Sequence, residues 1–182
     1  MRIISGSARG RKLETPRGDD IRPTSDMVKE AVFNILQFEL QGARVLDLFS
    51  GTGQLGIEAL SRGASSCVFV DASQDALLLT KRNVAAAGFA DSAELARTDA
   101  LGYLSRCGKF DIVFVDPPYG GDLLNSVLEK ISAFDILTER GIIVCELRTE
   151  YALAEISAPY KIAREYRYGK IKITTITKKN AE

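Results

Sequence analysis

The feature that most constrains the fold is a repeated alternation of short apolar runs with segments of helical periodicity. A run of about four to eight mostly apolar residues is typical of a buried strand, whereas apolar residues spaced three or four apart indicate a helix. Runs of the first kind occupy residues 44–49, 67–70, 93–97, 110–115 and 141–147, with helical segments between them. This alternation predicts a doubly wound α/β fold built on a mostly parallel sheet.

Antiparallel strands are expected at both ends of the chain. Residues 1–17 place two short strands around a loop rich in glycine and arginine, which predicts an N-terminal β-hairpin. Residues 164–176 alternate in the two-residue period of a strand around Gly169, which predicts a closing hairpin. Between the first hairpin and the first apolar run, residues 28–36 have the spacing of an amphipathic helix.

The chain of 182 residues fits one domain. We expect residues 1–22 to form a basic hairpin extension and residues 23–182 to form the core. No stretch reaches the ~20 apolar residues of a membrane span, and the first residues lack the apolar centre of a secretion signal. A cytoplasmic location without membrane contact is therefore expected.

Two features of the composition limit the chemistry. The sequence has no histidine, which removes the commonest general base and the commonest metal ligand. Cys67, Cys107 and Cys145 are scattered without C-x-x-C spacing, which argues against a disulfide framework and a zinc site. We therefore expect no metal and a reaction that does not depend on an imidazole base.

The net charge is zero, but the charge is unevenly distributed. Residues 1–22 hold six basic and three acidic side chains, and residues 159–182 hold seven basic and two acidic ones. The remaining residues are acidic in balance. Two basic ends around an acidic body suggest that the ends bind a polyanion, although Lys178 and Lys179 also fit the description of solvated terminal lysines.

A glycine-rich loop follows the first apolar run. Gly51, Gly53 and Gly56 have the spacing of a dinucleotide-binding fingerprint, and Asp71 lies 20 residues beyond Gly51 at the end of the next run. Gly56 could instead serve only helix–sheet packing. The pattern fits either NAD or S-adenosylmethionine. Asp47 favours the second, because a carboxylate beside the loop repels a pyrophosphate but suits a ligand with an ammonium and a sulfonium group.

A second motif, Asp116-Pro117-Pro118-Tyr119, ends the run at 110–115. Neither proline can donate to a sheet, so the strand stops at a stiff corner. A carboxylate and a neighbouring carbonyl are both acceptors, a pair suited to an amino group with two hydrogens. Tyr119 can stack on a planar base. In isolation, the motif fits a solvated strand-to-loop turn equally well.

Together these segments resemble a known family. The acidic residues and glycines have the order found in class I S-adenosylmethionine-dependent methyltransferases that act on exocyclic amino groups of bases. The sequence is most similar to the RsmD family of 16S ribosomal RNA guanine-N2 methyltransferases, from residue 2 to about the fifth apolar run. The matching segments are Arg2-Ile3-Ile4-x-Gly6, Arg9-Gly10-Arg11, Arg22-Pro23-Thr24-x-Asp26, Glu30-Ala31-x-Phe33-Asn34 and Leu55-Gly56-Ile57-Glu58-Ala59-Leu60-Ser61-Arg62-Gly63-Ala64.

The resemblance implies an S-adenosylmethionine-binding catalytic core at residues 23–182. Asp71 would hold the ribose of the cofactor and Asp99 its adenine, although Asp99 could instead be a helix cap. Thr24 and Asp26 would lie by the amino-acid end of the cofactor. The other implied cofactor contacts are Asp47, Phe49, Ser50, Gly51, Gly53 and Ala100.

The resemblance also implies a substrate. Asp116, Pro117, Pro118 and Tyr119 would hold a target guanine of the position-966 type in 16S rRNA, within a small-subunit particle and with the protein acting as a monomer. Met27 stands where such sequences often have arginine, and Gln54 where a small residue is usual. The side chains implied in RNA binding are Arg2, Arg9, Arg11, Lys12 and Arg22.

Four other functions share parts of the pattern. A DNA or RNA adenine-N6 methyltransferase shares the Asp-Pro-Pro-Tyr motif, but 182 residues leave little room for the separate recognition domain usual in the DNA enzymes. A protein glutamine N-methyltransferase would have no need of basic ends. An NAD-dependent dehydrogenase would use the same glycine loop, and a non-enzymatic RNA-binding module would have little use for Asp116 and Tyr119 beside it.

Overall fold

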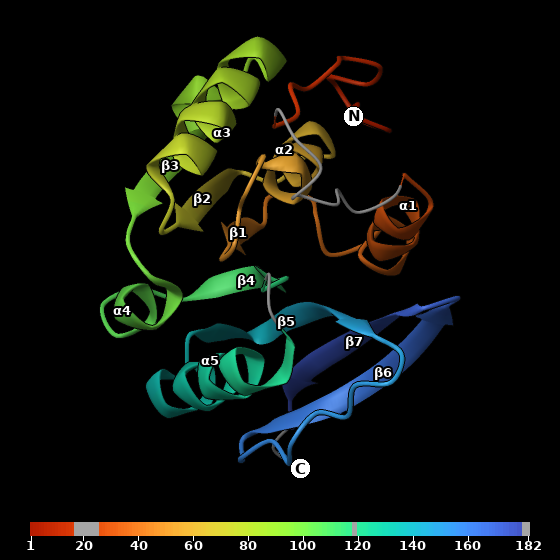
Figure 1. Ribbon diagram of the computed structural model, residues 1–182, viewed down its shortest axis with the longest axis vertical. Helices are drawn as coiled ribbons and strands as arrows, with labels where there is room; N and C mark the ends of the chain where they lie inside the picture. The colour runs from red at the N-terminus through yellow and green to blue at the C-terminus, as the bar shows by residue number, and fades with distance from the viewer. Residues whose placement is uncertain (17–25, 118–119, 180–182) are drawn as a thin grey trace.

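Figure 1 presents the computed structural model of the protein, which describes residues 1–16, 26–117 and 120–179. A seven-stranded sheet in the order β3-β2-β1-β4-β5-β7-β6 forms its centre. The strands are β1 (Arg44–Asp47), β2 (Ser66–Asp71), β3 (Ala93–Arg97), β4 (Phe110–Val115), β5 (Leu137–Arg148), β6 (Tyr160–Tyr168) and β7 (Ile171–Lys178). The helices are α1 (Asp26–Ile35), α2 (Gln54–Ser61), α3 (Gln74–Ala87), α4 (Ala100–Leu104) and α5 (Gly120–Phe134), with a 3-10 turn η1 (Ala90–Ser92).

The first five strands are parallel, and helices cover both faces of the sheet they form. On one face α1, α2 and α3 pack in a cluster that includes Phe69 and Phe114. On the other face α4 and α5 pack in a second cluster with Leu46 and Val113. The predicted doubly wound α/β sheet is therefore confirmed. The winding reverses between the neighbouring strands β1 and β4, which is the place where open α/β sheets bind ligands.

Several bounds differ from those expected. β1 ends at Asp47, two residues early, because the chain turns there into the glycine loop. β5 begins at Leu137 rather than at residue 141, since its first residues pair with β4 across a register shift. The ends of α3 carry local capping signals: the Ser73 side chain accepts from the backbone N–H of Ala76, and Gly88 closes the helix in the left-handed region.

The closing hairpin is also confirmed, with β6 and β7 antiparallel around Gly169. The expectation of a solvated Lys178 is wrong. This side chain is only 6% exposed, and its Nζ lies 2.8 Å from Asp135 Oδ1 and 3.3 Å from Glu139 Oε1. Lys172 is equally buried and pairs with Glu165 at 2.8 Å. Two basic residues of this hairpin are therefore neutralised by ion pairs within the fold.

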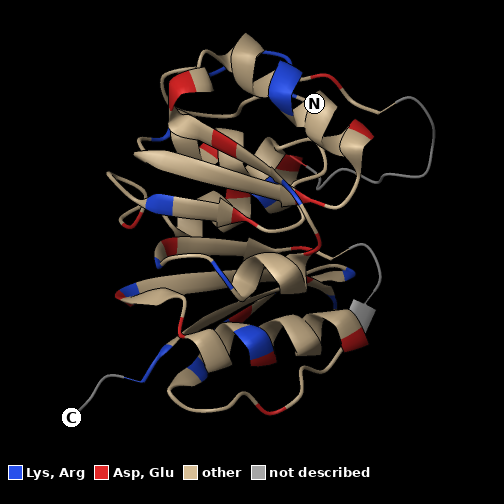
Figure 2. Ribbon diagram, turned by 90° about the vertical axis from the view of Figure 1, so that its left-hand side faces the viewer, with Lys and Arg blue, Asp and Glu red and all other residues tan. Residues whose placement is uncertain are grey.

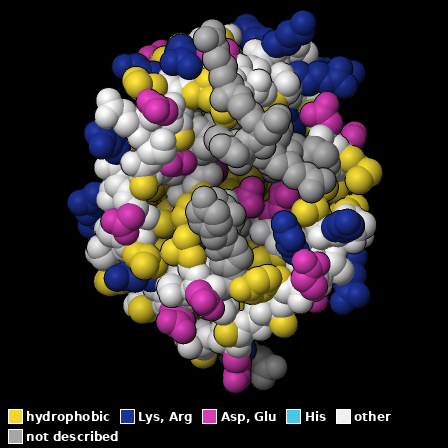
Figure 3. Space-filling model, in the orientation of Figure 1, with side chains coloured by type: hydrophobic (Ala, Val, Ile, Leu, Met, Phe, Trp, Pro, Cys, Tyr) yellow, Lys and Arg dark blue, Asp and Glu magenta, His cyan; other side chains and the backbone are white. Residues whose placement is uncertain are grey.

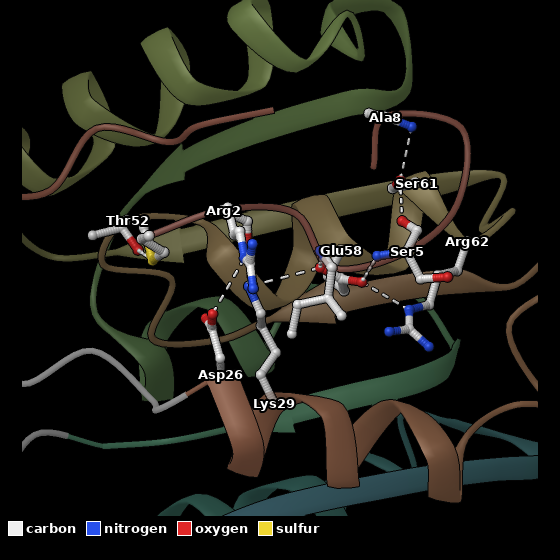
Figure 4. A network of polar contacts seen from close by, with 11 residues as sticks. Arg2, Ser5, Ala8, Asp26, Lys29, Thr52, Glu58, Ser61 and Arg62 are labelled. Carbon is white, nitrogen blue, oxygen red and sulfur yellow. Dashed lines mark hydrogen bonds and ion pairs between the residues drawn. The ribbon is translucent and has the colours of Figure 1, made fainter. Parts of the chain in front are cut away.

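The N-terminal hairpin is short and is attached to α2. Its strands are reduced to one antiparallel bridge between Arg2 and Lys12. Glu58 on α2 accepts from the backbone N–H groups of Ile4 and Ser5 at 2.8 and 2.9 Å, and further bonds link Ser61 to the same loop (Figure 4).

Glu58 is itself fully buried between two cations. Arg62 Nε lies 2.8 Å from its carboxylate, and Lys29 Nζ on α1 lies 3.7 Å away. Lys29 Nζ also donates to the carbonyl of Arg2 at 2.6 Å. Burial lowers the pKa of Lys29, while the charge of Glu58 opposes that shift. This charge network fixes the hairpin, α1 and α2 relative to one another.

Candidate active site

The carboxyl ends of the parallel strands border a cleft of about 1820 Å³. It contains residues from the glycine loop, from the ends of β2, β4 and β5, and from the start of α4. Figure 3 shows acidic side chains at the centre of this face of the molecule, while most lysines and arginines lie toward its rim. The position of the cleft matches the β1–β4 switch point of the fold.

The glycine loop is held in shape by the backbone conformation of its glycines and by side chains of α3. Gly51 and Gly53 have positive φ angles of 51° and 76°, which favour glycine. A Cβ on Gly53 would lie 2.8 Å from the side chain of Thr80. On α3, Thr80 Oγ1 donates to the carbonyl of Gly51, and Asn83 Nδ2 donates to that of Thr52. No pattern in the sequence predicted these two contacts between α3 and the loop.

Gly56 lies directly against β2. A Cβ at this position would be 2.3 Å from the Phe69 ring and 2.6 Å from Cys67 Sγ. The close approach agrees with the packing explanation of the third glycine.

Asp47 lies at the end of β1, beneath the loop. Its side chain lines the cleft but is almost completely buried, and it accepts from the N–H of Gly56 at 3.0 Å. Burial raises the pKa of Asp47 to about 7, with a further contribution from the charge of Asp71. A cationic ligand would stabilise the ionised form of this carboxylate, because the charge of the ligand compensates for the solvation that burial has removed.

Asp71 and Asp99 line the same cleft from the ends of β2 and β3. The carboxylate of Asp71 accepts from the N–H of Gly51 at 2.9 Å and from that of Ser73 at 2.8 Å. Asp99 caps α4 by accepting from the N–H of Gly102 at 2.8 Å. This contact is the helix cap expected from the sequence as the alternative role of Asp99. Each carboxylate has lone pairs beyond these bonds.

Asp116 and Pro117 extend β4 into the cleft. Burial, and after it the neighbouring charges of Glu146 and Asp47, raise the pKa of Asp116 to about 8. Glu146 lines the cleft near the end of β5. The sequence prediction missed Glu146, although an acidic residue at the end of a buried strand is the same signal that indicated Asp71 and Asp116.

Two buried polar atoms in the cleft have no hydrogen-bond partner among the described residues. They are Ser50 Oγ, on a residue that is 5% exposed, and Gln54 Oε1, on one that is 8% exposed. Buried polar groups without partners are rare in native proteins and frequently belong to ligand sites. A ligand with hydrogen-bond donors would satisfy both.

The predicted cofactor residues are largely brought together. The cleft is lined by Asp47, Phe49, Ser50, Gly51, Asp71, Asp99 and Ala100. Gly53 shapes the loop without lining the cleft, and Asp26 instead lies 3.5 Å from Arg2 Nε, outside it. Thr24, Pro118 and Tyr119 lie outside the described residues.

The predicted RNA-binding residues lie on the N-terminal hairpin. Arg2, Arg9, Arg11 and Lys12 are exposed there, whereas Arg22 lies outside the described residues. One guanidinium nitrogen of Arg11 donates to the carbonyl of Ala86 on α3, across the surface. The C-terminal hairpin lies at the opposite end of the molecule, and Figure 2 shows basic residues near both ends of the chain.

In the described parts of the chain, His, Cys, Asp and Glu side chains form no cluster that could hold a metal ion. The helices of those parts include none that is long and apolar enough to cross a membrane.

Comparison with known proteins identifies the family. The family model described as "Conserved hypothetical protein 95" matches residues 1–177. Ribosomal RNA small subunit methyltransferase D of Escherichia coli strain K12 is 34% identical over 172 residues, which cover 94% of this chain and 86% of that protein. This chain is a member of the RsmD family. YlbH of Bacillus subtilis strain 168 is 40% identical over 173 residues, which cover 93% of this chain and 94% of YlbH.

Solved structures agree with RsmD membership. The protein yhhF from Escherichia coli superposes with a TM-score of 0.89 at 30% identity, over 100% of this chain and 99% of yhhF. The protein TTHA0928 from Thermus thermophilus gives a TM-score of 0.82 at 26% identity, over 97% and 99% of the two chains. The fold is that of the class I methyltransferases.

Proposed function

We propose that this RsmD-family protein methylates the exocyclic N2 amine of a guanine in 16S ribosomal RNA, at the position-966 type of site. Membership of the RsmD family supports the broader part of this proposal, that the protein is an S-adenosylmethionine-dependent rRNA methyltransferase. The observation that carries the finer proposal is the convergence of four strand-end carboxylates, Asp47, Asp71, Asp99 and Asp116, on one cleft.

The residues of the cleft fit S-adenosylmethionine. Asp47 is a buried carboxylate suited to the positive charges of the methionine portion, and the unpartnered atoms of Ser50 and Gln54 suit its ammonium hydrogens. Asp71 would accept from the ribose hydroxyls and Asp99 from the adenine amine. When bound, the cofactor supplies an electrophilic methyl group on a sulfonium.

The chain must then position a weakly nucleophilic amine. The N2 lone pair of guanine is delocalised into the ring, and hydrogen bonds from both amine hydrogens would orient it. The Asp116 carboxylate and the Pro117 carbonyl would provide two such acceptors, and both residues line the cleft. Because neither acceptor is an imidazole, the rate would come chiefly from positioning and electrostatics, with the surplus proton leaving to Asp116 or to water.

The exposed N-terminal hairpin would bind RNA phosphates. Arg9, Arg11 and Lys12 stand on a loop that Glu58 and Ser61 fix to α2. Reaching a base amine also requires an unstacked nucleotide, which RNA loops supply at low cost. We propose that the substrate is a small-subunit particle and that the protein acts as a cytoplasmic monomer.

The test is methyl transfer in vitro to small subunits from cells that lack this protein. Nucleosides digested from the 16S rRNA are separated by mass spectrometry, and the expected product is N2-methylguanosine. Asp116→Ala should lower the rate by about 10² to 10³-fold or more while retaining affinity for S-adenosylhomocysteine, whereas Asp91→Ala, at an exposed position of η1, should retain activity.

Three results would contradict the proposal. Methyl groups transferred to form N6-methyladenosine would indicate the adenine N6-methyltransferase alternative. Methyl groups transferred to protein would indicate the glutamine N-methyltransferase alternative. Near-normal turnover by Asp116→Ala would exclude this residue from the site.

A further inference from the structure

We propose that Glu146 accepts a hydrogen bond from the N1–H of the target guanine and thereby makes the cleft select guanine over adenine. This inference rests on the proposed function and adds a residue that distinguishes the two bases at the same site.

The sheet register places Glu146 beside Asp116. Val115 of β4 is paired with Cys145 of β5 in the parallel ladder, so the residues that follow them occupy corresponding positions on adjacent strands. Adjacent strands lie about 4.8 Å apart. Both following residues line the cleft. The charge of Glu146 also contributes to the raised pKa of Asp116, which agrees with their proximity.

Two neighbouring carboxylates match the edge of guanine. Its N1–H and N2–H₂ groups are donors on two nitrogens bonded to the same carbon, C2, so one acceptor facing each nitrogen can pair with both groups. Adenine carries an acceptor at N1, and a carboxylate facing that lone pair would repel it. A site built around a substrate N–H rejects analogues that lack it, because a hydrogen bond is then replaced by a repulsive contact.

The cleft has room for a nucleotide at this point. Its volume of about 1820 Å³ exceeds the roughly 300–1,000 Å³ usual for a single small ligand. At the end of β5 and the start of β7 its lining includes Leu147, Tyr151 and Ile171. Tyr151 and Ile171 are half-buried and would offer aromatic and apolar surface to a flat base.

The experiment compares two bases that both carry an amine at position 2. The target nucleotide of 16S rRNA is supplied, by ligation of a synthetic fragment, as guanosine or as 2-aminopurine riboside, which has an acceptor at N1. The preference is the ratio of kcat/KM for guanosine to that for 2-aminopurine. Differences in the intrinsic reactivity of the two bases cancel when this ratio is compared between protein variants.

Glu146→Gln is the informative variant, because an amide can accept from N1–H or donate to an N1 lone pair. We expect its preference for guanosine to be about 10 to 100-fold smaller than that of the unaltered protein. Glu146→Asp, which keeps the carboxylate, should retain most of the preference at a lower rate. Glu155→Gln is the control, since Glu155 is exposed and does not line the cleft, and its preference should be unchanged.

An unchanged preference in Glu146→Gln, relative to the unaltered protein, overturns the inference. If Glu146→Gln is inactive on both, the relative affinities for the two RNAs are measured by filter binding. The same shift is then expected, and its absence overturns the inference in the same way. Failure of the proposed function is distinguishable, because the unaltered protein would then form no N2-methylguanosine at all.

Discussion

Replacing Asp47 with asparagine should stabilise the cofactor-free protein at alkaline pH while destroying its cofactor site. Burial raises the pKa of Asp47 from 3.8 to about 7. The folded state therefore holds a proton that the unfolded chain releases, and this contributes stability at low pH that is lost as the pH rises through about 7.

The magnitude follows from that pKa difference. At ~1.4 kcal/mol for each tenfold change in proton affinity, the raised pKa lowers the free energy of unfolding, relative to its value at low pH, by about 4 kcal/mol at pH about 8.5 and by less than 2 kcal/mol at pH about 5. Asparagine carries no charge at either pH, and its side-chain oxygen can still accept from the N–H of Gly56. The gain in unfolding free energy from Asp47→Asn should thus be about 3 kcal/mol larger at the higher pH.

The assay is urea denaturation of both proteins at the two pH values, with free energies from linear extrapolation. Asp91→Asn, at an exposed position, serves as the control and should show no such pH-dependent gain. Calorimetry with S-adenosylhomocysteine should show that Asp47→Asn binds it much more weakly. A difference between Asp47→Asn and the unaltered protein that is the same at both pH values would refute the electrostatic reasoning.

Three further outcomes are expected. Asp116 should act in its ionised form, which is the stronger acceptor for an amine hydrogen and can take the surplus proton, and burial together with the charges of Glu146 and Asp47 raises its pKa to about 8. The kcat/KM for RNA should therefore rise with pH toward about 8, and a flat profile from pH about 6 upward would contradict this. Glu58→Gln should lower the urea-derived unfolding free energy by about 3 kcal/mol, since it leaves a buried lysine without its counter-charge, whereas Glu30→Gln on the exposed side of α1 should change it little. Charge reversal at Arg9 and Arg11 should weaken RNA binding and reduce the slope of log affinity against log salt by about 1.5; an unaltered slope in filter binding would exclude the hairpin from phosphate contact.

The core of the fold was predictable because its signals are local. Residues 110–115 form a strand since a run that is apolar except for Asp111 suits a strand buried on both faces, and Pro117 marks its end. Ser73 and Gly88 marked the two ends of α3 through capping chemistry that depends only on nearby backbone. The same locality placed Asp71, Asp99 and Asp116 at strand ends, whereas the end of β1 at Asp47 was predicted two residues too late. Parallel strands bring such ends to one edge of a sheet.

What the sequence alone determined about this protein is therefore the parallel sheet, the glycine loop and the acidic strand ends that meet in the cleft. The tertiary structure decided which charged groups are buried and what they contact. Lys29 and Glu58 are fully buried although nothing in their neighbourhood along the chain predicts it, and the bond from Ile4 to Glu58 joins residues 54 positions apart. Such contacts depend on how separate elements pack, because the cost of burying a charge is offset only by partners that folding brings near.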